Sequence, residues 1–240
     1  MTGHGTRPAG SNIGEPQIIM QTPIHYGDGV QAICKNLRNS ILKGTLEPGR
    51  KLKIQALAEG YGTSIIPVRE ALRTLAAEGL VVIRPRKSPL VAKPDIDEVM
   101  EINEIRRALE PRTLFHAVSL HTQTSLARCK QILERDRACV QTWRRVELNR
   151  QFHIELLAPS GRIRTLQVIK EQYGPICLFA HLQVVQDKVM EGEAVQEHEA
   201  ILEAVARRDT SEAIRLLDRH LALAAKRIVV IARQSERNPA

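Results

Sequence analysis

The chain has 240 residues, of which 43% are hydrophobic and 26% charged, a balance that can bury an apolar core and excludes a chain that is disordered throughout. Its 35 basic and 27 acidic residues give a net charge of +8. Residues 30–94 carry 12 basic and 4 acidic side chains, whereas residues 95–240 carry 22 and 21. Because the surplus is confined to one segment, it favours an anionic partner for that segment.

The cysteines and apolar runs restrict the class of protein further. The chain contains four cysteines, Cys34, Cys129, Cys139 and Cys177. They form no Cys-x-x-Cys pair, which argues against a disulfide framework or a zinc finger and favours a reducing cytoplasm. The longest apolar runs, such as residues 228–232, fall far short of the ~18 residues that a membrane span needs. We therefore expect a cytoplasmic protein without a membrane partner.

The first 29 residues hold six glycines and three prolines without a periodic apolar pattern, which predicts a flexible tail. A helix that ends near Gly44 follows, because its apolar residues recur at i, i+3, i+4 and i+7. These residues are Val30, Ile33, Cys34, Leu37 and Ile41. A short second helix over residues 54–61 stops at Gly62, and Ser64 has the hydroxyl that can cap a third.

The third predicted helix has a stripe of apolar residues, Val68, Leu72 and Leu75, and it ends at Gly79. The sequence then predicts two short strands, at residues 80–83 and 90–92, on either side of a basic turn. Three helices followed by a two-stranded wing is the order of a winged helix-turn-helix, which we place at residues 30–94.

A winged helix lays its third helix in the major groove of DNA and needs cationic side chains on and around that helix. Six residues are candidates for DNA contacts: Ser64, Arg69, Arg73, Arg84, Arg86 and Lys87. Arg69 and Arg73 suit base edges or phosphates, Ser64 suits a phosphate, and the other three belong to the wing. For any one arginine a solvated helix face is the simpler explanation, but the cluster together favours DNA binding.

Beyond residue 94 the pattern is almost wholly helical. Candidate helices lie at about 96–121, 125–138, 142–158, 163–190, 193–207 and 210–234. A break at Gly174-Pro175 could split the fourth, so we expect an antiparallel bundle of six or seven helices over residues 95–234, with a short tail at 235–240. The fold class is therefore mostly α.

Three histidines of this half have spacings that could bring them together. Asn149 and His153 lie four residues apart on one predicted helix, which places them on the same face. His198 and His220 each lie 11 residues from Asp209, the centre of a predicted turn. Three imidazoles with the Asn149 oxygen would suit a divalent ion such as Zn²⁺ or Ni²⁺, with a position open for water or a carboxylate. Packed or surface positions for these histidines are the alternative.

A motif of about 40 residues includes Gly62-x-Ser64-x-x-Pro67-Val68-Arg69-Glu70-Ala71-Leu72 and Glu78-Gly79-Leu80-Val81. It resembles the DNA-binding domain of the GntR family of bacterial transcription regulators. The resemblance implies a further DNA contact at Gln55, where that family often has a basic residue. Two departures, Ile65 where the family commonly has arginine and Ser88 where it has a wing glycine, lead us to expect an unusual operator.

The helical half carries Asn149-x-x-Phe152-His153, Glu197-His198-x-x-Ile201 and His220-Leu221. These resemble the FCD effector domain of the FadR branch of that family, and six helices would fit its VanR-like subgroup. The resemblance implies that Asn149, His153, His198 and His220 bind a metal ion that helps to hold a small carboxylate effector. It also implies that Arg106 faces this effector.

An ion pair with Glu110, one helical turn later, is the alternative role for Arg106, and Trp143 and Phe152 could line a cavity or simply pack. We expect a homodimeric regulator that binds a pseudo-palindromic operator, and we assign no catalytic residues. The sequence leaves open whether the ligand releases or promotes DNA binding, and the family resemblance implies a repressor that its ligand releases. A metalloenzyme with an appended DNA-targeting module is an alternative, although it lacks an evident general base. A metal sensor without an organic effector is another.

Overall fold

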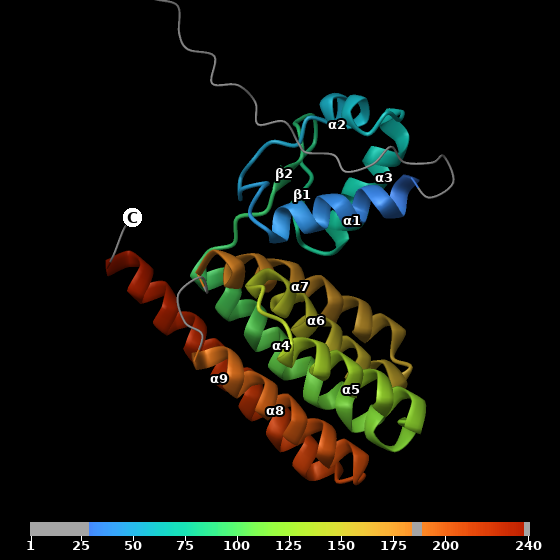
Figure 1. The fold of residues 1–240 in the computed structure, drawn as a ribbon, viewed down its shortest axis with the longest axis vertical. Helices are drawn as coiled ribbons and strands as arrows, with labels where there is room; N and C mark the ends of the chain where they lie inside the picture. The colour runs from blue at the N-terminus through green and yellow to red at the C-terminus, as the bar shows by residue number, and fades with distance from the viewer. Residues whose placement is uncertain (1–28, 184–188, 238–240) are drawn as a thin grey trace, which may run out of the picture.

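The computed structural model describes residues 29–183 and 189–237, so most of the two predicted tails lies outside the described residues. A small N-terminal domain sits above a helical bundle, with α1 facing the bundle (Figure 1). The prediction of a mostly α fold, with a winged helix-turn-helix before an antiparallel bundle, is confirmed. No helix within the described ranges is long and apolar enough to cross a membrane.

The N-terminal domain contains three helices and a two-stranded wing. In chain order these are α1 (Gly29–Leu42), α2 (Ile54–Gly60), α3 (Ile65–Ala77), β1 (Val81–Val82) and β2 (Leu90–Val91). The two strands pair antiparallel, and each is shorter than the sequence predicts. The chain before α2 joins the wing, because the Gly49 N–H donates to the Val91 carbonyl at 2.9 Å.

The core of this domain forms where α1 packs on α3. Ile33 and Leu37 of α1, and Val68 and Leu72 of α3, are all at most 1% exposed, as their helical spacing predicts. Ser64 lies just before α3 with an extended backbone, but its side chain makes no cap hydrogen bond. The predicted capping role of Ser64 is therefore wrong in this structure, and its exposed hydroxyl stays accessible together with the N–H groups of the first turn.

The C-terminal domain contains six helices within the described residues. They are α4 (Ile96–Ala117), α5 (Gln123–Arg137), α6 (Thr142–Leu157), α7 (Ile163–Gln183), α8 (Val189–Ala206) and α9 (Thr210–Arg237). Pro175 lies inside α7 and does not divide it, because a proline removes one backbone hydrogen bond and can leave the helix continuous. The described residues of this domain thus form six α-helices rather than seven, and α9 runs three residues further than expected.

The two domains touch through glycine backbones. A Cβ built on Gly174 of α7 would lie 1.8 Å from the carbonyl oxygen of Glu78, and a Cβ on Gly79 would lie 2.6 Å from Pro175 Cδ. Gly79 also has a φ of +73°, which an L side chain rarely adopts. Any side chain at either glycine would therefore push the winged helix away from the bundle.

Candidate functional site

The structure brings the three predicted histidines together inside the bundle. His153 comes from α6, His198 from α8 and His220 from α9, and they are 0%, 1% and 4% exposed. Their Nε2 atoms form a triangle: His153 to His220 is 3.3 Å, His198 to His153 is 3.2 Å and His198 to His220 is 3.1 Å. We call these three residues the histidine cluster.

Two carboxylates fix the orientation of two of these rings. Glu110 Oε2 lies 2.9 Å from His153 Nδ1, and Glu197 Oε2 lies 2.7 Å from His220 Nδ1. Burial by itself would raise the pKa of Glu110, but Arg106 and His153 lower it to about 2. Burial opposes the shift at Glu197 as well, where hydrogen bonds from His220 and Arg227 lower the pKa to about 2. Both groups are ionised acceptors at neutral pH, so each Nδ1 must carry the hydrogen.

This assignment leaves nitrogen lone pairs facing one another. With hydrogen on Nδ1, the Nε2 atoms of His153 and His220 are both acceptors at 3.3 Å, a contact that no hydrogen bond satisfies. Burial lowers the pKa of His153 to about 4 against the opposing effect of Glu110, so the His153 ring does not gain a second hydrogen at neutral pH. A cation at the centre of the triangle would satisfy it.

The dimensions of the triangle fit a metal ion. Three nitrogens that bind one Zn²⁺ at about 2.0–2.1 Å with tetrahedral angles lie about 3.3 Å apart, and the observed separations are 3.1–3.3 Å. Three imidazoles and an open position also suit Ni²⁺. The residues present therefore fit a divalent ion. Of the three rings, His198 has the least support, because its Nδ1 is buried without a hydrogen-bond partner in the described part of the chain.

The remaining predicted residues of the site lie around the cluster. Asn149 is half-buried one turn before His153 on α6. Phe152 is fully buried and packs on the His198 ring, with 4.5 Å between centroids. Trp143 packs against the hydrophobic core.

Arg106 is buried in the ion pair that the sequence offered as its alternative role. Its Nε donates to Glu110 at 2.6 Å, and its terminal nitrogen donates to the Tyr173 hydroxyl at 2.8 Å. Tyr173 in turn donates to Glu110 at 2.9 Å, and burial raises its pKa far above the usual value, so it stays a neutral donor. Arg106, Tyr173 and Glu110 thus form one buried network that ends on His153.

The sequence analysis did not predict that Glu110, Glu197 and Tyr173 support the histidine cluster. Glu110 is visible only as an i+4 partner of Arg106, because its contact with His153 spans 43 residues. Glu197 precedes His198 in sequence but bonds His220 instead. Tyr173 carries no sequence signal at all.

Two other histidines of the described residues, His121 and His116, lie outside the cluster. His121 is buried, with its two ring nitrogens 3.0 Å from Ser125 Oγ and 2.9 Å from the Leu156 carbonyl oxygen. His116 lies at the surface beside Arg162, whose guanidinium is 3.1 Å from its Nε2. His181 lies in the part of α7 whose side chains are outside the described set.

The predicted DNA-contacting residues lie on α2, α3 and the wing. Arg69 is exposed and makes no hydrogen bond or ion pair within the described ranges. Arg73 is exposed and lies 3.0 Å from Glu70, a surface pair that a phosphate can replace at little cost. Gln55 is exposed and donates to Glu59 at 3.2 Å. With Ser64 exposed as well, this surface presents polar and cationic groups to solvent.

The wing adds further cations. Arg86 and Lys87 are exposed at its turn, while Arg84 is half-buried. The Arg84 Nε atom is buried without a partner among the described residues. Arg86 adopts a φ of +58°, a left-handed conformation that is unfavourable for a residue other than glycine. The turn therefore holds a cation where a glycine would fit more easily.

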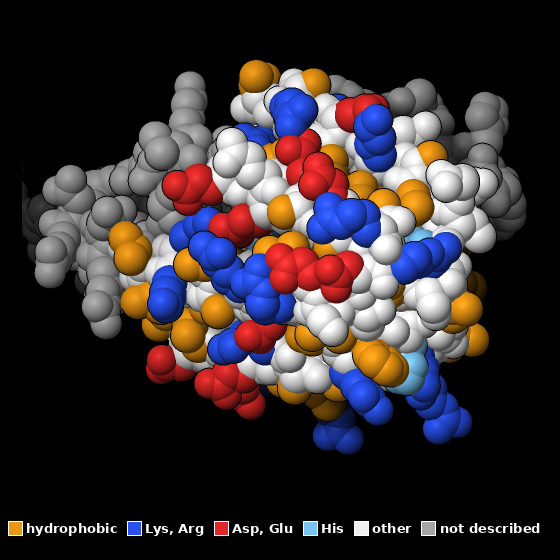
Figure 2. Space-filling model, turned by 90° about the horizontal axis from the view of Figure 1, so that it is seen from below, with side chains coloured by type: hydrophobic (Ala, Val, Ile, Leu, Met, Phe, Trp, Pro, Cys, Tyr) orange, Lys and Arg blue, Asp and Glu red, His pale blue; other side chains and the backbone are white. Residues whose placement is uncertain are grey.

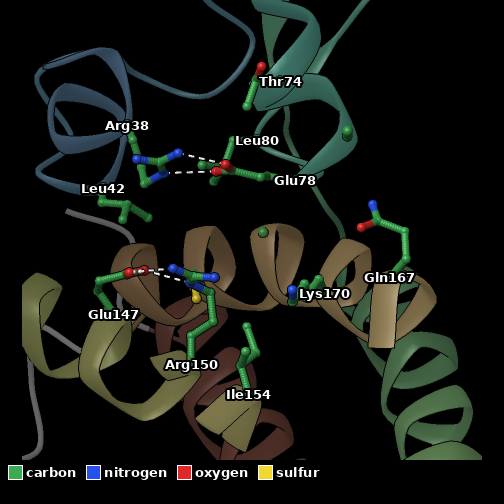
Figure 3. A pocket seen from close by; sticks show the side chains of 13 residues that line it. Arg38, Leu42, Thr74, Glu78, Leu80, Glu147, Arg150, Ile154, Gln167 and Lys170 are labelled. Atoms are coloured by element: carbon green, nitrogen blue, oxygen red, sulfur yellow. Dashed lines mark hydrogen bonds and ion pairs between the residues drawn. The ribbon is translucent and has the colours of Figure 1, made fainter. Parts of the chain in front are cut away.

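A pocket of about 380 Å³ lies between the two domains. On its upper side Arg38 donates to Glu78 at 2.6 and 2.8 Å, and on its lower side Arg150 donates to Glu147 at 2.5 and 2.7 Å (Figure 3). Lys170 of α7 completes the charged lining. Each ion pair forms within one domain, so a change in how the domains dock need not break either pair.

The face of the bundle that lies opposite the N-terminal domain does not share the excess of positive charge on α3 and the wing. Lysine and arginine side chains are interspersed with aspartate and glutamate on the face opposite the N-terminal domain (Figure 2). This mixture agrees with the nearly equal numbers of acidic and basic residues after residue 94, and the N-terminal domain is the part suited to an anionic partner.

Comparisons with known proteins match both domains. The family of bacterial regulatory proteins named gntR matches residues 30–91, and the FCD domain matches residues 101–223. The HTH-type transcriptional repressor GlaR of Escherichia coli is 25% identical over 195 residues, covering 77% of this chain and 89% of the relative. The repressor RspR of the same organism is 26% identical over 198 residues, with 80% and 85% covered.

The fold also resembles solved structures. Escherichia coli McbR/YncC superimposes with a TM-score of 0.71 at 23% identity, over 86% of this chain and 98% of that chain, which supports the fold. Family and relatives are transcription regulators, which contradicts the metalloenzyme alternative. The chain therefore belongs to the FadR branch of the GntR family of bacterial transcription regulators, with a winged helix-turn-helix for DNA and an FCD domain behind it.

Proposed function

We propose that this regulator is a homodimeric repressor whose FCD domain binds a divalent metal ion, Zn²⁺ or Ni²⁺, and a small carboxylate effector. The observation that carries the proposal is the histidine cluster, in which three Nε2 atoms lie within 3.3 Å of one another and two of the rings are held by carboxylates. The names of GlaR and RspR, both repressors, support the regulatory sign.

His153, His198 and His220 would hold the ion, and Asn149, one turn from His153, is the candidate for a fourth ligand. When bound, the ion supplies a positive charge that attracts a carboxylate to its open position. Arg106 would supply the second charge. Its guanidinium can grip a carboxylate through two parallel hydrogen bonds, provided that Glu110 gives up part of its present contact.

A carboxylate effector would compete with Glu110 for Arg106, and this competition favours one alternative function, a metal sensor without an organic effector. Glu110 already holds Arg106 at 2.6 Å in a site where neither group is more than 4% exposed. A carboxylate effector must replace interactions that a buried pair makes well, whereas a metal ion binds the cluster without disturbing them. The two proposals differ in whether an acid changes DNA binding beyond the metal.

A short route joins the cluster to the DNA-binding domain. Tyr173 bonds Glu110, which holds His153, and the next residue along α7, Gly174, touches the Glu78 backbone of the winged helix. A shift of α7 by a bound ligand would therefore move the point where the domains dock. If the domains can dock in two arrangements, the ligand changes the operator affinity only as far as the ligand itself binds one arrangement more tightly than the other.

The operator is expected to be a pseudo-palindrome that a dimer reads with two winged helices. One recognition helix reads a half-site only, and a symmetric dimer places two of them about one helical turn of DNA apart. A footprint of two inverted half-sites, together with a dimer mass in sedimentation, is the expected result.

The test is an operator titration on the full-length protein, stripped of metal with a chelator and then reloaded with Zn²⁺ or Ni²⁺. Each form is titrated with and without acetate, lactate, succinate and gluconate. An acid response that requires metal supports the carboxylate effector, and a response to metal alone supports the sensor. Stoichiometric metal content in the wild type is expected, and failure of both ions to bind would overturn the metal proposal while the DNA-binding function stands.

A further inference from the structure

The first turn of α3 exposes two isoleucines. Ile66 is 68% exposed and Ile65 is 38% exposed. Ile66, Arg69 and Arg73 recur at i, i+3 and i+7 and so lie on one face of the helix. The opposite face carries Val68, which is fully buried. Ile66 therefore belongs to the outward face of the recognition helix and does not serve the core.

The charges around Ile66 indicate which partner would cover it. Arg69 and Arg73 are exposed on the same face, and Arg86 and Lys87 are exposed on the wing of the same domain. An apolar protein surface would have to desolvate these cations, whereas DNA offers them phosphates. Within the major groove, the one apolar group on a base edge is the 5-methyl of thymine.

We propose that Ile66, with Ile65 beside it, reads thymine methyl groups in the major groove, so that thymine at one position of each half-site determines operator specificity. This inference rests on the DNA-binding function of the family and deepens it. Arg69 and Arg73 flank the contact and bind phosphates or base acceptors.

The chemistry of the other bases supports this specificity. Guanine and adenine present the N7 acceptor, and cytosine presents an amino donor. A branched aliphatic side chain would leave any of these polar groups desolvated and unpaired, whereas it removes the thymine methyl from water. The preference therefore has both a favourable contact and a penalty against the wrong base.

The experiment removes only the methyl group. The full-length protein selects duplexes from a random-sequence library, and the enriched duplex is remade with deoxyuridine in place of one thymidine at a time. Fluorescence anisotropy measures the affinity of the wild type, Ile66→Ala and Ile65→Ala for each duplex. The matched control is Ile163→Ala, because Ile163 is 80% exposed on α7 of the bundle, outside the DNA-binding domain.

We expect an enriched thymine whose replacement by deoxyuridine weakens wild-type binding about fourfold, the effect of one methyl group. Ile66→Ala should bind the thymidine duplex more weakly by a similar factor and lose nothing further with deoxyuridine. Ile163→Ala should behave as the wild type does. Ile65→Ala should give a smaller part of the same effect.

Two results would overturn the inference while the DNA-binding function stands. The first is salt-dependent binding whose affinity no deoxyuridine substitution changes. The second is an equal loss of affinity on deoxyuridine substitution in the wild type and in Ile66→Ala, since another residue would then contact the methyl group. A change in oligomeric mass with Ile66→Ala and no change in base preference would assign the isoleucines to a protein interface instead. Failure to select any duplex would overturn the DNA-binding function itself.

Discussion

Replacing Gly174 by alanine tests the contact that joins the two domains. The new Cβ would lie 1.8 Å from the Glu78 carbonyl oxygen, whereas an ordinary contact between carbon and oxygen is about 3.3 Å. The winged helix must therefore move away from α7 by about 1.5 Å. Tyr173, which is fully buried and bonded to Glu110, holds α7 in place, so we expect the N-terminal domain to move.

Gly174→Ala should destabilise the contact between the two domains without destabilising the fold of either domain. Overpacking of this kind costs about 1–3 kcal/mol, which lowers the ratio of docked to undocked protein by roughly 5-fold to 150-fold. The bundle itself gains, because alanine in the middle of a helix is about 1 kcal/mol more favourable than glycine. The variant should therefore remain folded and keep the histidine cluster intact while the domains separate.

Hydrogen exchange and DNA binding together measure the effect. We expect faster amide exchange around residues 76–80, an unchanged bundle core, and a ratio of operator affinities with and without metal that moves toward one. Gly29→Ala is the matched control, because a Cβ at Gly29 meets only Pro67, at 4.0 Å. Wild-type exchange together with an undiminished metal response in Gly174→Ala would refute the reasoning.

Three further predictions concern the two sites. His198→Ala should lose the bound ion, because two imidazoles cannot replace three, while the control His116→Ala, at a half-buried residue outside the cluster, should keep it. Elemental analysis measures the metal content, and full occupancy without His198 would refute the cluster. Arg69→Ala should weaken operator binding and reduce its salt dependence by about one phosphate contact, whereas the control Arg207→Ala, in the bundle, should bind as the wild type does. An Arg69→Ala variant with wild-type affinity at moderate salt would show that Arg69 does not contact DNA. The metal-free protein should lose stability as the pH falls from 6.5 to 4. The folded state keeps His153 neutral, with a pKa of about 4, whereas the unfolded chain takes up a proton on this ring. Urea unfolding midpoints that stay constant over this pH range would contradict the prediction.

The helices, the wing and their order along the chain could be predicted from the sequence alone. The apolar stripe of α3, at Val68, Leu72 and Leu75, follows from a period of 3.6 residues, and such local patterns need no knowledge of distant contacts. The pairing of His198 with His220 was also accessible, because a hairpin with equal arms places both residues at the same height. Local rules were less reliable for Ser64, which has the chemistry of a cap but makes no cap hydrogen bond.

The surroundings of the histidines and the contact between the domains depend on how the helices pack in three dimensions. The Nδ1 hydrogen of His153 is fixed by Glu110, 43 residues away, and Tyr173 joins them from a third helix, so no spacing along the chain encodes the network. Gly174 interrupts a helical pattern for a reason that lies in the other domain, where the Glu78 backbone leaves no room for a side chain. Periodicity records which face of a helix is buried, whereas hydrogen bonds and close contacts depend on how the helices pack against one another.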